Sequence, residues 1–285
     1  MDGTALDTLV GISTLVFVVT SMVSMGLSLT VPQIRDSLSS TRLVVVALAV
    51  NFIAVPAVAY GIDFALDLGE SLFIRLILIA VAGGAPFLPK LVQVAKGDAA
   101  LSVGLMVLLM VATVVVMPLA LPLLLEGVEV NAWDIASSLI FLMLVPLAIS
   151  LFVRARYPRQ AEQAVGPFGM ISSVALAFLA VGGIVGNWSD VVSLIGTRGI
   201  LAALLLIVIA FGLGFATGGG DLATRSVMGL GTGQRNLSAA FVVAVQNFAD
   251  DGDVLAFVIV AGLIGLVVLM AGAAEIGRRR PSAPG

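Results

Sequence analysis

The residues best placed to do chemistry lie in the run Gly229-Leu-Gly-Thr-Gly-Gln-Arg-Asn236, inside an apolar segment from about residue 223 to residue 247. An arginine at the centre of a membrane span costs roughly 3 kcal/mol on insertion scales. Glycines at every second position weaken the helix around this charge and free backbone N–H and C=O groups to face a polar site. The pattern predicts a broken helix with a polar site at half depth. The alternative is a packing helix whose arginine extends to the membrane surface.

A second apolar segment, at residues 71–95, carries the interruption Gly83-Gly-Ala-Pro-Phe-Leu-Pro-Lys90. Its prolines remove backbone donors and clash with the preceding helical turn, so a continuous helix is not expected. Interrupted spans at matching places in the two halves of a chain indicate inverted repeats with a binding site at their interface. Free half-helix N-termini at such a site favour an anion, and free C-termini favour a cation.

Polar and charged residues at these interruptions are the candidates for substrate or ion binding. Arg235 and Lys90 supply positive charge, although Lys90 is also close enough to the cytoplasmic end of its span to reach the surface. Ser102 is the weakest candidate, because a serine hydroxyl in a helix often bonds its own backbone. Asp98 is expected to cap the helix that follows it. The polar candidates on the spans are Asn51, Ser102, Thr232, Gln234, Asn236 and Ser238.

Composition indicates an all-α polytopic membrane protein. The chain has 285 residues, of which 60% are hydrophobic and 11% are charged, and its mean hydropathy is +1.18. A soluble domain of this size would lack the polar surface that water must solvate. The sequence contains no histidine and no cysteine, which removes the usual proton shuttle, disulfides and thiolate chemistry. Because it also lacks a pair of acidic residues at mid-membrane depth, we do not expect an enzyme.

Apolar runs of about 20 residues predict about nine transmembrane helices. They cover residues 8–30, 43–62, 71–95, 99–125, 134–153, 165–186, 199–217, 223–247 and 254–276. Alternate loops are basic, at Arg35, Arg42, Lys96, Arg154, Arg156, Arg159, Arg225 and Arg278–Arg280. Most of the other loops are acidic, at Asp63, Asp67, Glu70, Glu126, Glu129, Asp250, Asp251 and Asp253. The positive-inside rule therefore predicts a multi-pass protein of the bacterial inner (plasma) membrane, with its N-terminus outside and its C-terminus in the cytoplasm.

The chain resembles the bile acid:sodium symporter family over nearly its whole length, with the motifs in the same order. The most specific match is Ala95-Lys-Gly-Asp-Ala-Ala-Leu-Ser102, which is similar to the family's Ala-(Arg/Lys)-Gly-(Asn/Asp)-x-Ala-Leu-Ser. Weaker matches are Met25–Thr30, Val50–Pro56 and Gly233–Ser238. The resemblance implies ten helices in two inverted five-helix repeats, with crossed discontinuous helices. The first of these ten helices is missing here.

The same resemblance implies one transmembrane transporter domain over residues 1–285. Its panel helices are expected at about residues 8–30 and 134–186, and its core helices at about residues 43–125 and 199–276. Residues 278–285 are expected to form a cytoplasmic tail.

This chain departs from the family at the sodium ligands. The family binds sodium with a Ser-Asn pair in the first broken helix and with Glu and Gln in the second. The resemblance places these ligands at Leu88, Pro89, Gly231 and Arg235, whereas Asn51, Ser102 and Asn236 persist as family site residues. A sodium ion about 4 Å from a fixed cation would be repelled by about 4 kcal/mol at an effective dielectric constant of 20. We therefore hypothesise that Lys90 and Arg235 take over the electrostatic role of sodium, or bind a carboxylate or sulfonate directly.

The sequence thus predicts a secondary transporter that moves a small organic anion by alternating access and uses no cofactor. Sodium coupling is in doubt, and uniport, exchange and proton coupling through a lysine are the other modes. The alternatives are a sodium-coupled symporter of an organic acid and a channel or receptor-like membrane protein that does not transport. The expected partners are a small anionic substrate and the lipid bilayer, and no nucleic acid.

Overall fold

The computed structural model describes residues 3–125, 131–186, 192, 194, 197–248 and 252–279. Every regular element in these ranges is helical: α1 (Gly3–Ser28), α2 (Val31–Ser37), α3 (Thr41–Ala49), η1 (Val50–Ala54), α4 (Val55–Leu66), α5 (Glu70–Ala80), α6 (Leu88–Val94), α7 (Ala99–Leu124), α8 (Ala132–Leu139), η2 (Ile140–Leu144), α9 (Val145–Arg156), α10 (Pro158–Gly186), α12 (Gly199–Thr217), α13 (Leu222–Gly233), α14 (Leu237–Asn247) and α15 (Gly252–Arg279). Glu126, Glu129, Asp250, Asp251 and residues 280–285, which the charge pattern included, lie outside the described residues.

The helices confirm the all-α membrane class. In the described part of the chain, seven helical segments are long and apolar enough to cross a membrane. Two further segments are interrupted where the sequence predicts, between α5 and α6 at residues 81–87 and between α13 and α14 at residues 234–236. The total of nine spans, the inverted repeats and the orientation in the membrane stay predictions.

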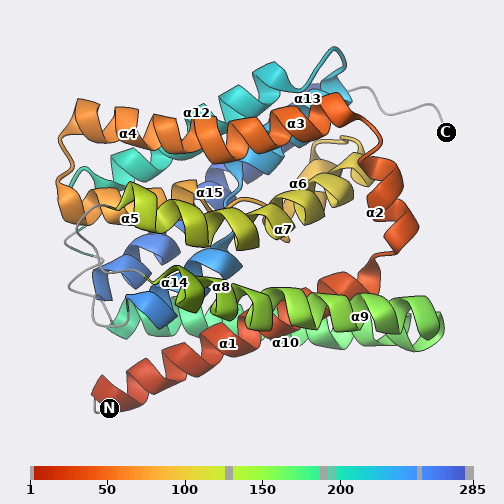
Figure 1. Cartoon of the computed structure of the whole chain (residues 1–285), viewed down its shortest axis with the longest axis horizontal. Helices are drawn as coiled ribbons and strands as arrows, with labels where there is room; N and C mark the ends of the chain where they lie inside the picture. Colours follow the sequence, from red (N-terminus) through yellow and green to blue (C-terminus); the bar gives the residue numbers. More distant parts are fainter. Residues whose placement is uncertain are drawn as a thin grey trace.

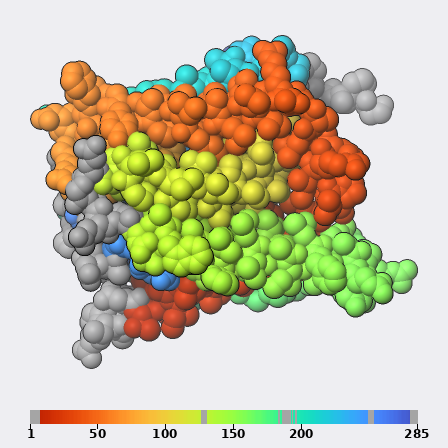
Figure 2. Space-filling view, viewed as in Figure 1, coloured from red at the N-terminus to blue at the C-terminus, as the bar shows by residue number. Residues whose placement is uncertain are grey.

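The helices form two layers (Figure 1). One layer consists of α1, α10 and the α8–α9 segment, and the other contains α3 to α7 and α12 to α15. The layers meet where α7 packs on α8 and where α14 packs on α8 and α1. In the space-filling view the yellow to lime residues of α7 lie directly above the green ones of α8 and α9 (Figure 2). The division of the chain into a panel and a core stays a prediction.

Two long spans widen into a π-helical turn just before a proline. The π-helical segment η1 ends two residues before Pro56, and η2 ends two residues before Pro146. Proline has no N–H and its ring clashes with the carbonyl four residues earlier, which a wider turn accommodates. The wide turn of η1 holds Asn51, whose side chain is fully buried.

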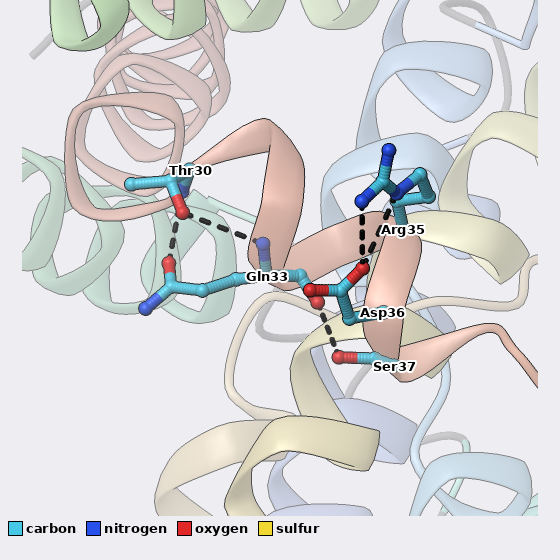
Figure 3. A network of polar contacts seen from close by, with 5 residues as sticks. All are labelled: Thr30, Gln33, Arg35, Asp36 and Ser37. Atoms are coloured by element: carbon cyan, nitrogen blue, oxygen red, sulfur yellow. Dashed lines mark hydrogen bonds and ion pairs between the residues drawn. The ribbon is translucent and has the colours of Figure 1, made fainter.

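The short helix α2, which the sequence analysis treated as a loop, joins the two layers. Thr30 accepts a hydrogen bond from the Gln33 N–H at 3.4 Å, and the Thr30 N–H donates to Gln33 Oε1 at 2.9 Å (Figure 3). This reciprocal capping box, with Pro32 in the first turn, starts a helix of seven residues. The far end of α2 packs on α7, where a Cβ at Gly104 would overlap Ser37.

Helix α7 holds the first interruption in place. The hydroxyl of Thr113 accepts a hydrogen bond from the Gly83 N–H at 2.9 Å and donates to the Gly83 carbonyl at 2.9 Å. The next residue, Gly84, has φ +77°, and a Cβ there would overlap the backbone of Leu109 and Met110. This stretch therefore needs glycine for its conformation and for its close approach to α7.

Replacement of Thr113 by valine tests this attachment. Thr113→Val keeps the side-chain shape but leaves both backbone groups of Gly83 unpaired, so the free energy of unfolding should fall by about 2–4 kcal/mol. The matched control is Thr20→Val, since the Thr20 hydroxyl bonds only the Val16 carbonyl of its own helix, and it should change stability by less than about 0.5 kcal/mol. Unfolding of detergent-solubilised protein by SDS measures both, and equal losses for the two variants would refute the attachment.

Replacement of Gly84 tests the need for glycine. Gly84→Ala should destabilise the protein by about 3 kcal/mol, because it adds backbone strain to a steric overlap with α7. Gly61→Ala is the control, since a Cβ there meets nothing within 4 Å, and alanine in a helix is expected to be neutral or to stabilise by up to about 1 kcal/mol. Thermal unfolding of the purified variants separates the two cases. A Gly84→Ala variant as stable as Gly61→Ala would show that the close approach to α7 is wrong.

Candidate functional site

Arg235 lies in the gap between α13 and α14, and its side chain is bonded to the other interrupted helix. The residue is only 5% exposed. Its Nε donates to the Ile79 carbonyl at 3.1 Å, and its Nη2 donates to the Ala80 carbonyl at 2.7 Å. Its Nη1 donates to the Thr232 carbonyl at 2.8 Å and to Asn51 Oδ1 at 3.1 Å. The arginine does not extend to the membrane surface, and the guanidinium joins three separate elements.

Most of these acceptors are carbonyls at the C-terminal ends of half-helices. Ile79 and Ala80 are the last two residues of α5, and Thr232 is in the last turn of α13. The last four carbonyls of a helix have no partner within the helix, and together they carry the negative end of its dipole. Inside a membrane such groups must find a donor within the protein. A single guanidinium therefore satisfies the exposed ends of both half-helices and places a positive charge where their dipoles favour it.

The two interruptions also contact each other through their backbones and through Asn51. The Asn236 N–H donates to the Ala82 carbonyl at 2.8 Å. The Nδ2 of Asn51 donates to Thr232 Oγ1 at 3.2 Å and to the Ala47 carbonyl at 3.0 Å, while its Oδ1 accepts from Arg235. Asn51, Thr232 and Arg235, which the sequence singled out on two different spans, thus form one buried network. Asn236 joins it through the backbone.

Three buried polar atoms without a partner belong to residues at the second interruption and at the start of α14. Among the described residues, Gln234 Oε1, Asn236 Nδ2 and Ser238 Oγ are buried and have no hydrogen-bond partner. Asn236 and Ser238 are 0% and 1% exposed. Both lie at the start of α14, where Asn236 Oδ1 caps the Ala239 N–H at 3.1 Å. Buried polar atoms are seldom left unpaired, so these three are candidates for contact with a bound molecule.

The structure does not bring Lys90 or Ser102 into the Arg235 network. Lys90 is exposed, and its Nζ lies 5.7 Å from the centre of the Phe87 ring. Ser102 is buried and donates to the Ala99 carbonyl of its own helix at 2.6 Å. Asp98 caps α7 through the Leu101 N–H at 2.9 Å, which confirms the expected cap.

The positions that the resemblance assigns to sodium ligands carry no suitable oxygen. A Cβ at Gly231 would lie 2.7 Å from Leu105 Cδ2 and 3.1 Å from Leu88 Cδ2, so Gly231 and Leu88 meet in an apolar contact. Pro89 follows in the first turn of α6 and offers only a backbone carbonyl. In the described ranges no group of three or more acidic residues could hold a metal ion. At Leu88, Pro89 and Gly231 no side chain can therefore offer an oxygen to a sodium ion.

Two other contacts of polar residues differ from expectation. Thr113, which holds Gly83, was not among the candidates, because one threonine within a strongly apolar helix gives no signal in a single sequence. Arg75, on α5, was not among the candidates either. It is 5% exposed, donates to Ser71 at 2.6 Å and forms an ion pair with Asp253. The carboxylate that binds it lies far away in sequence, so only the folded chain reveals it.

Comparison with known proteins agrees with the resemblance. The sodium bile acid symporter family matches residues 15–216. A probable chloroplastic sodium/metabolite cotransporter of rice, Oryza sativa subsp. japonica, is 26% identical over 234 residues, which are 80% of this chain and 55% of the relative. A second probable chloroplastic sodium/metabolite cotransporter, from Arabidopsis thaliana, is 24% identical over 241 residues, which are 83% of this chain and 60% of the relative.

A bacterial relative is also similar. An uncharacterized sodium-dependent transporter of Bacillus subtilis is 22% identical over 236 residues, which are 80% of this chain and 72% of that protein. The match to this chain covers 55% and 60% of the two plant relatives. Since the family match covers more than half of the chain, the protein belongs to the sodium bile acid symporter family.

Proposed function

We propose that this protein is a secondary transporter that moves a small organic anion by alternating access, with Arg235 in the place that sodium takes in its relatives. The observation that carries the proposal is the set of four hydrogen bonds from a buried guanidinium to oxygens of both interrupted helices and of η1. Family membership supports transport, and the details of coupling and substrate follow from this chain's own residues.

The Arg235 guanidinium suits the role of a fixed cation. Carbonyl and amide oxygens at the C-terminal ends of half-helices are the groups that coordinate cations in transporters of this general design. Here three such carbonyls, of Ile79, Ala80 and Thr232, already receive N–H donors from Arg235, as does the amide oxygen of Asn51 in η1. A sodium ion at the same oxygens would displace these hydrogen bonds and meet a positive charge at contact distance. The apolar contact of Gly231 with Leu88 supports the same reading at the family's other ligand positions.

The substrate is an anion that binds at the start of α14. Asn236 Nδ2 and Ser238 Oγ are buried hydrogen-bond donors without a partner among the described residues, and they lie at the positive end of a helix of 11 residues. The unpaired atom of the neighbouring Gln234 is the acceptor Oε1, so the proposed donors are Asn236 Nδ2 and Ser238 Oγ. A carboxylate or sulfonate would accept from these donors while Arg235 supplies a positive charge nearby. The proposed site does not include Lys90, which is exposed on α6.

The two layers supply the moving parts of the proposed mechanism. The Arg235 network lies entirely within the layer of α3 to α7 and α12 to α15, because each of its residues comes from η1, α5 or the α13–α14 segment. Alternating access is then a movement of this layer, the core, against the panel of α1, α8–α9 and α10. The fixed cation travels with the core throughout the cycle.

Uptake into proteoliposomes tests the proposal, with radiolabelled pyruvate and pantoate as probes. Saturable uptake should change by less than about twofold when an inward sodium gradient is replaced by potassium, since the cation is built in. Arg235→Gln should lower uptake by about tenfold or more, which corresponds to the loss of a charged hydrogen bond of about 1.4 kcal/mol or above. Arg225→Gln is the control. Arg225 bonds the Phe215 carbonyl and stacks on the Phe215 ring, away from the network, so uptake should stay within about twofold of wild type.

Three outcomes would overturn the proposal in different ways. Strong sodium dependence that survives Arg235→Gln would favour the sodium-coupled symporter. Unsaturable flux with measurable conductance would favour a channel. Uptake that is equally low for Arg225→Gln and Arg235→Gln would remove the special role of Arg235.

A further inference from the structure

The positive charge of Arg235 has no acidic partner. The sequence has no Asp or Glu at residues 41–62, 71–97 or 222–249, which include both interruptions and η1. All four hydrogen bonds of the guanidinium are to neutral oxygens. Among the described residues, none of the ion pairs includes Arg235. The region where the two interruptions meet therefore carries a net charge of about +1. Only backbone dipoles and neutral amides offset this charge.

The other cations of the core do not change this balance. Arg75 is paired with Asp253 at the start of α15, so its charge is compensated there. Lys90 is exposed, where solvent or lipid headgroups screen it. Arg235 remains as a buried charge, and it directly precedes Asn236 in the chain, whose Nδ2 is buried without a partner among the described residues.

A monovalent anion bound at the start of α14 would neutralise this charge. In a medium of low dielectric constant, an opposite charge nearby is worth far more than in water, whereas an unpaired charge is costly to enclose. With a monoanion the core is electrically balanced and can pass through a closed, dry intermediate. With no anion the same passage encloses an unpaired guanidinium.

We infer that the protein is an exchanger, which carries a monovalent organic anion in each direction. Its core moves between the two sides of the membrane only when an anion is bound. The inference rests on the proposed function and adds its mode of transport. A sodium ion can leave together with the substrate, so a sodium symporter can return with an uncharged site. Arg235 is part of the chain and cannot leave. The movement of the core without a bound anion is therefore slow in this protein, and one anion enters for each anion that leaves.

The same balance sets the preferred charge of the substrate. One guanidinium compensates one negative charge, so the loaded core is neutral with a monocarboxylate or a monosulfonate and negative with a dicarboxylate. Exchange of monoanions is then electroneutral and insensitive to the membrane potential. Dianions should compete poorly, because they carry an uncompensated charge into the closed intermediate.

Trans-stimulation of uptake tests the inference with the whole protein in liposomes. Labelled pyruvate is supplied outside, and the vesicles contain either unlabelled pyruvate or potassium sulfate. Initial uptake should be at least about tenfold faster into pyruvate-loaded vesicles. It should change by less than about twofold between inside-negative and inside-positive potassium diffusion potentials set with valinomycin, because the exchange moves no net charge. The series is repeated with pantoate, and with malate as the dianion.

Variants give a second measurement. The ratio compares uptake into pyruvate-loaded vesicles with uptake into sulfate-filled vesicles. Arg235→Gln should bring this ratio close to one, because the core without an anion is then uncharged. Arg225→Gln should keep the wild-type ratio. If Arg235→Gln does not fold, the wild-type ratio and its insensitivity to voltage decide the question. Equal, voltage-dependent uptake into both kinds of vesicle would overturn exchange and leave the transporter assignment intact. Absence of uptake of both monoanions in every vesicle would overturn the proposed function, and the inference with it.

Discussion

The guanidinium of Arg235 holds the interrupted helices together. Inside a membrane, a broken helix is tolerated only where its free carbonyls find donors within the protein. In this protein one side chain donates to the ends of α5 and α13 and to the amide of Asn51. The close approach that this requires explains the surrounding small residues. Gly84 lies against the backbone of α7, and Gly231 lies against Leu88 and Leu105.

The second interruption has two chemically different sides. On the C-terminal side of α13, the Thr232 carbonyl accepts a hydrogen bond from Arg235. On the N-terminal side of α14, the side chains of Asn236 and Ser238 are buried without partners among the described residues. The same interruption therefore carries a fixed cation and begins a helix whose first residues hold donors that suit an anion. This pairing connects the loss of the family's sodium ligands with the kind of substrate that we propose, and it gives the anion the charge-balancing role that a mobile ion has elsewhere.

Much of the fold could be predicted from the sequence because the membrane imposes simple rules. Span lengths follow from apolar runs, and both interruptions follow from glycine and proline. Arg235 stood out because a charge in an apolar segment needs an explanation. Its partners were partly predictable, since Asn51 and Thr232 are polar residues at similar depth. Its bonds to the Ile79 and Ala80 carbonyls were not, because backbone acceptors leave no mark in a sequence.

The remaining differences come from contacts between distant parts of the chain. Lys90 is next to the first interruption in sequence, yet its side chain is exposed, because the direction of a side chain on a short helix depends on packing. The ion pair of Arg75 with Asp253 and the attachment of Gly83 to Thr113 both join residues that are far apart in the chain. Helix α2 was missed because seven residues are too few to show a clear helical period.

Direct binding of radioactive sodium to the purified protein tests the central claim, that a guanidinium occupies the position of the sodium ion. Scintillation-proximity measurement with ²²Na⁺ reports binding without any need to know the substrate. We predict no saturable binding at millimolar sodium, with or without pyruvate or pantoate present. Saturable ²²Na⁺ binding that excess unlabelled sodium displaces, in a protein that retains Arg235, would contradict the claim.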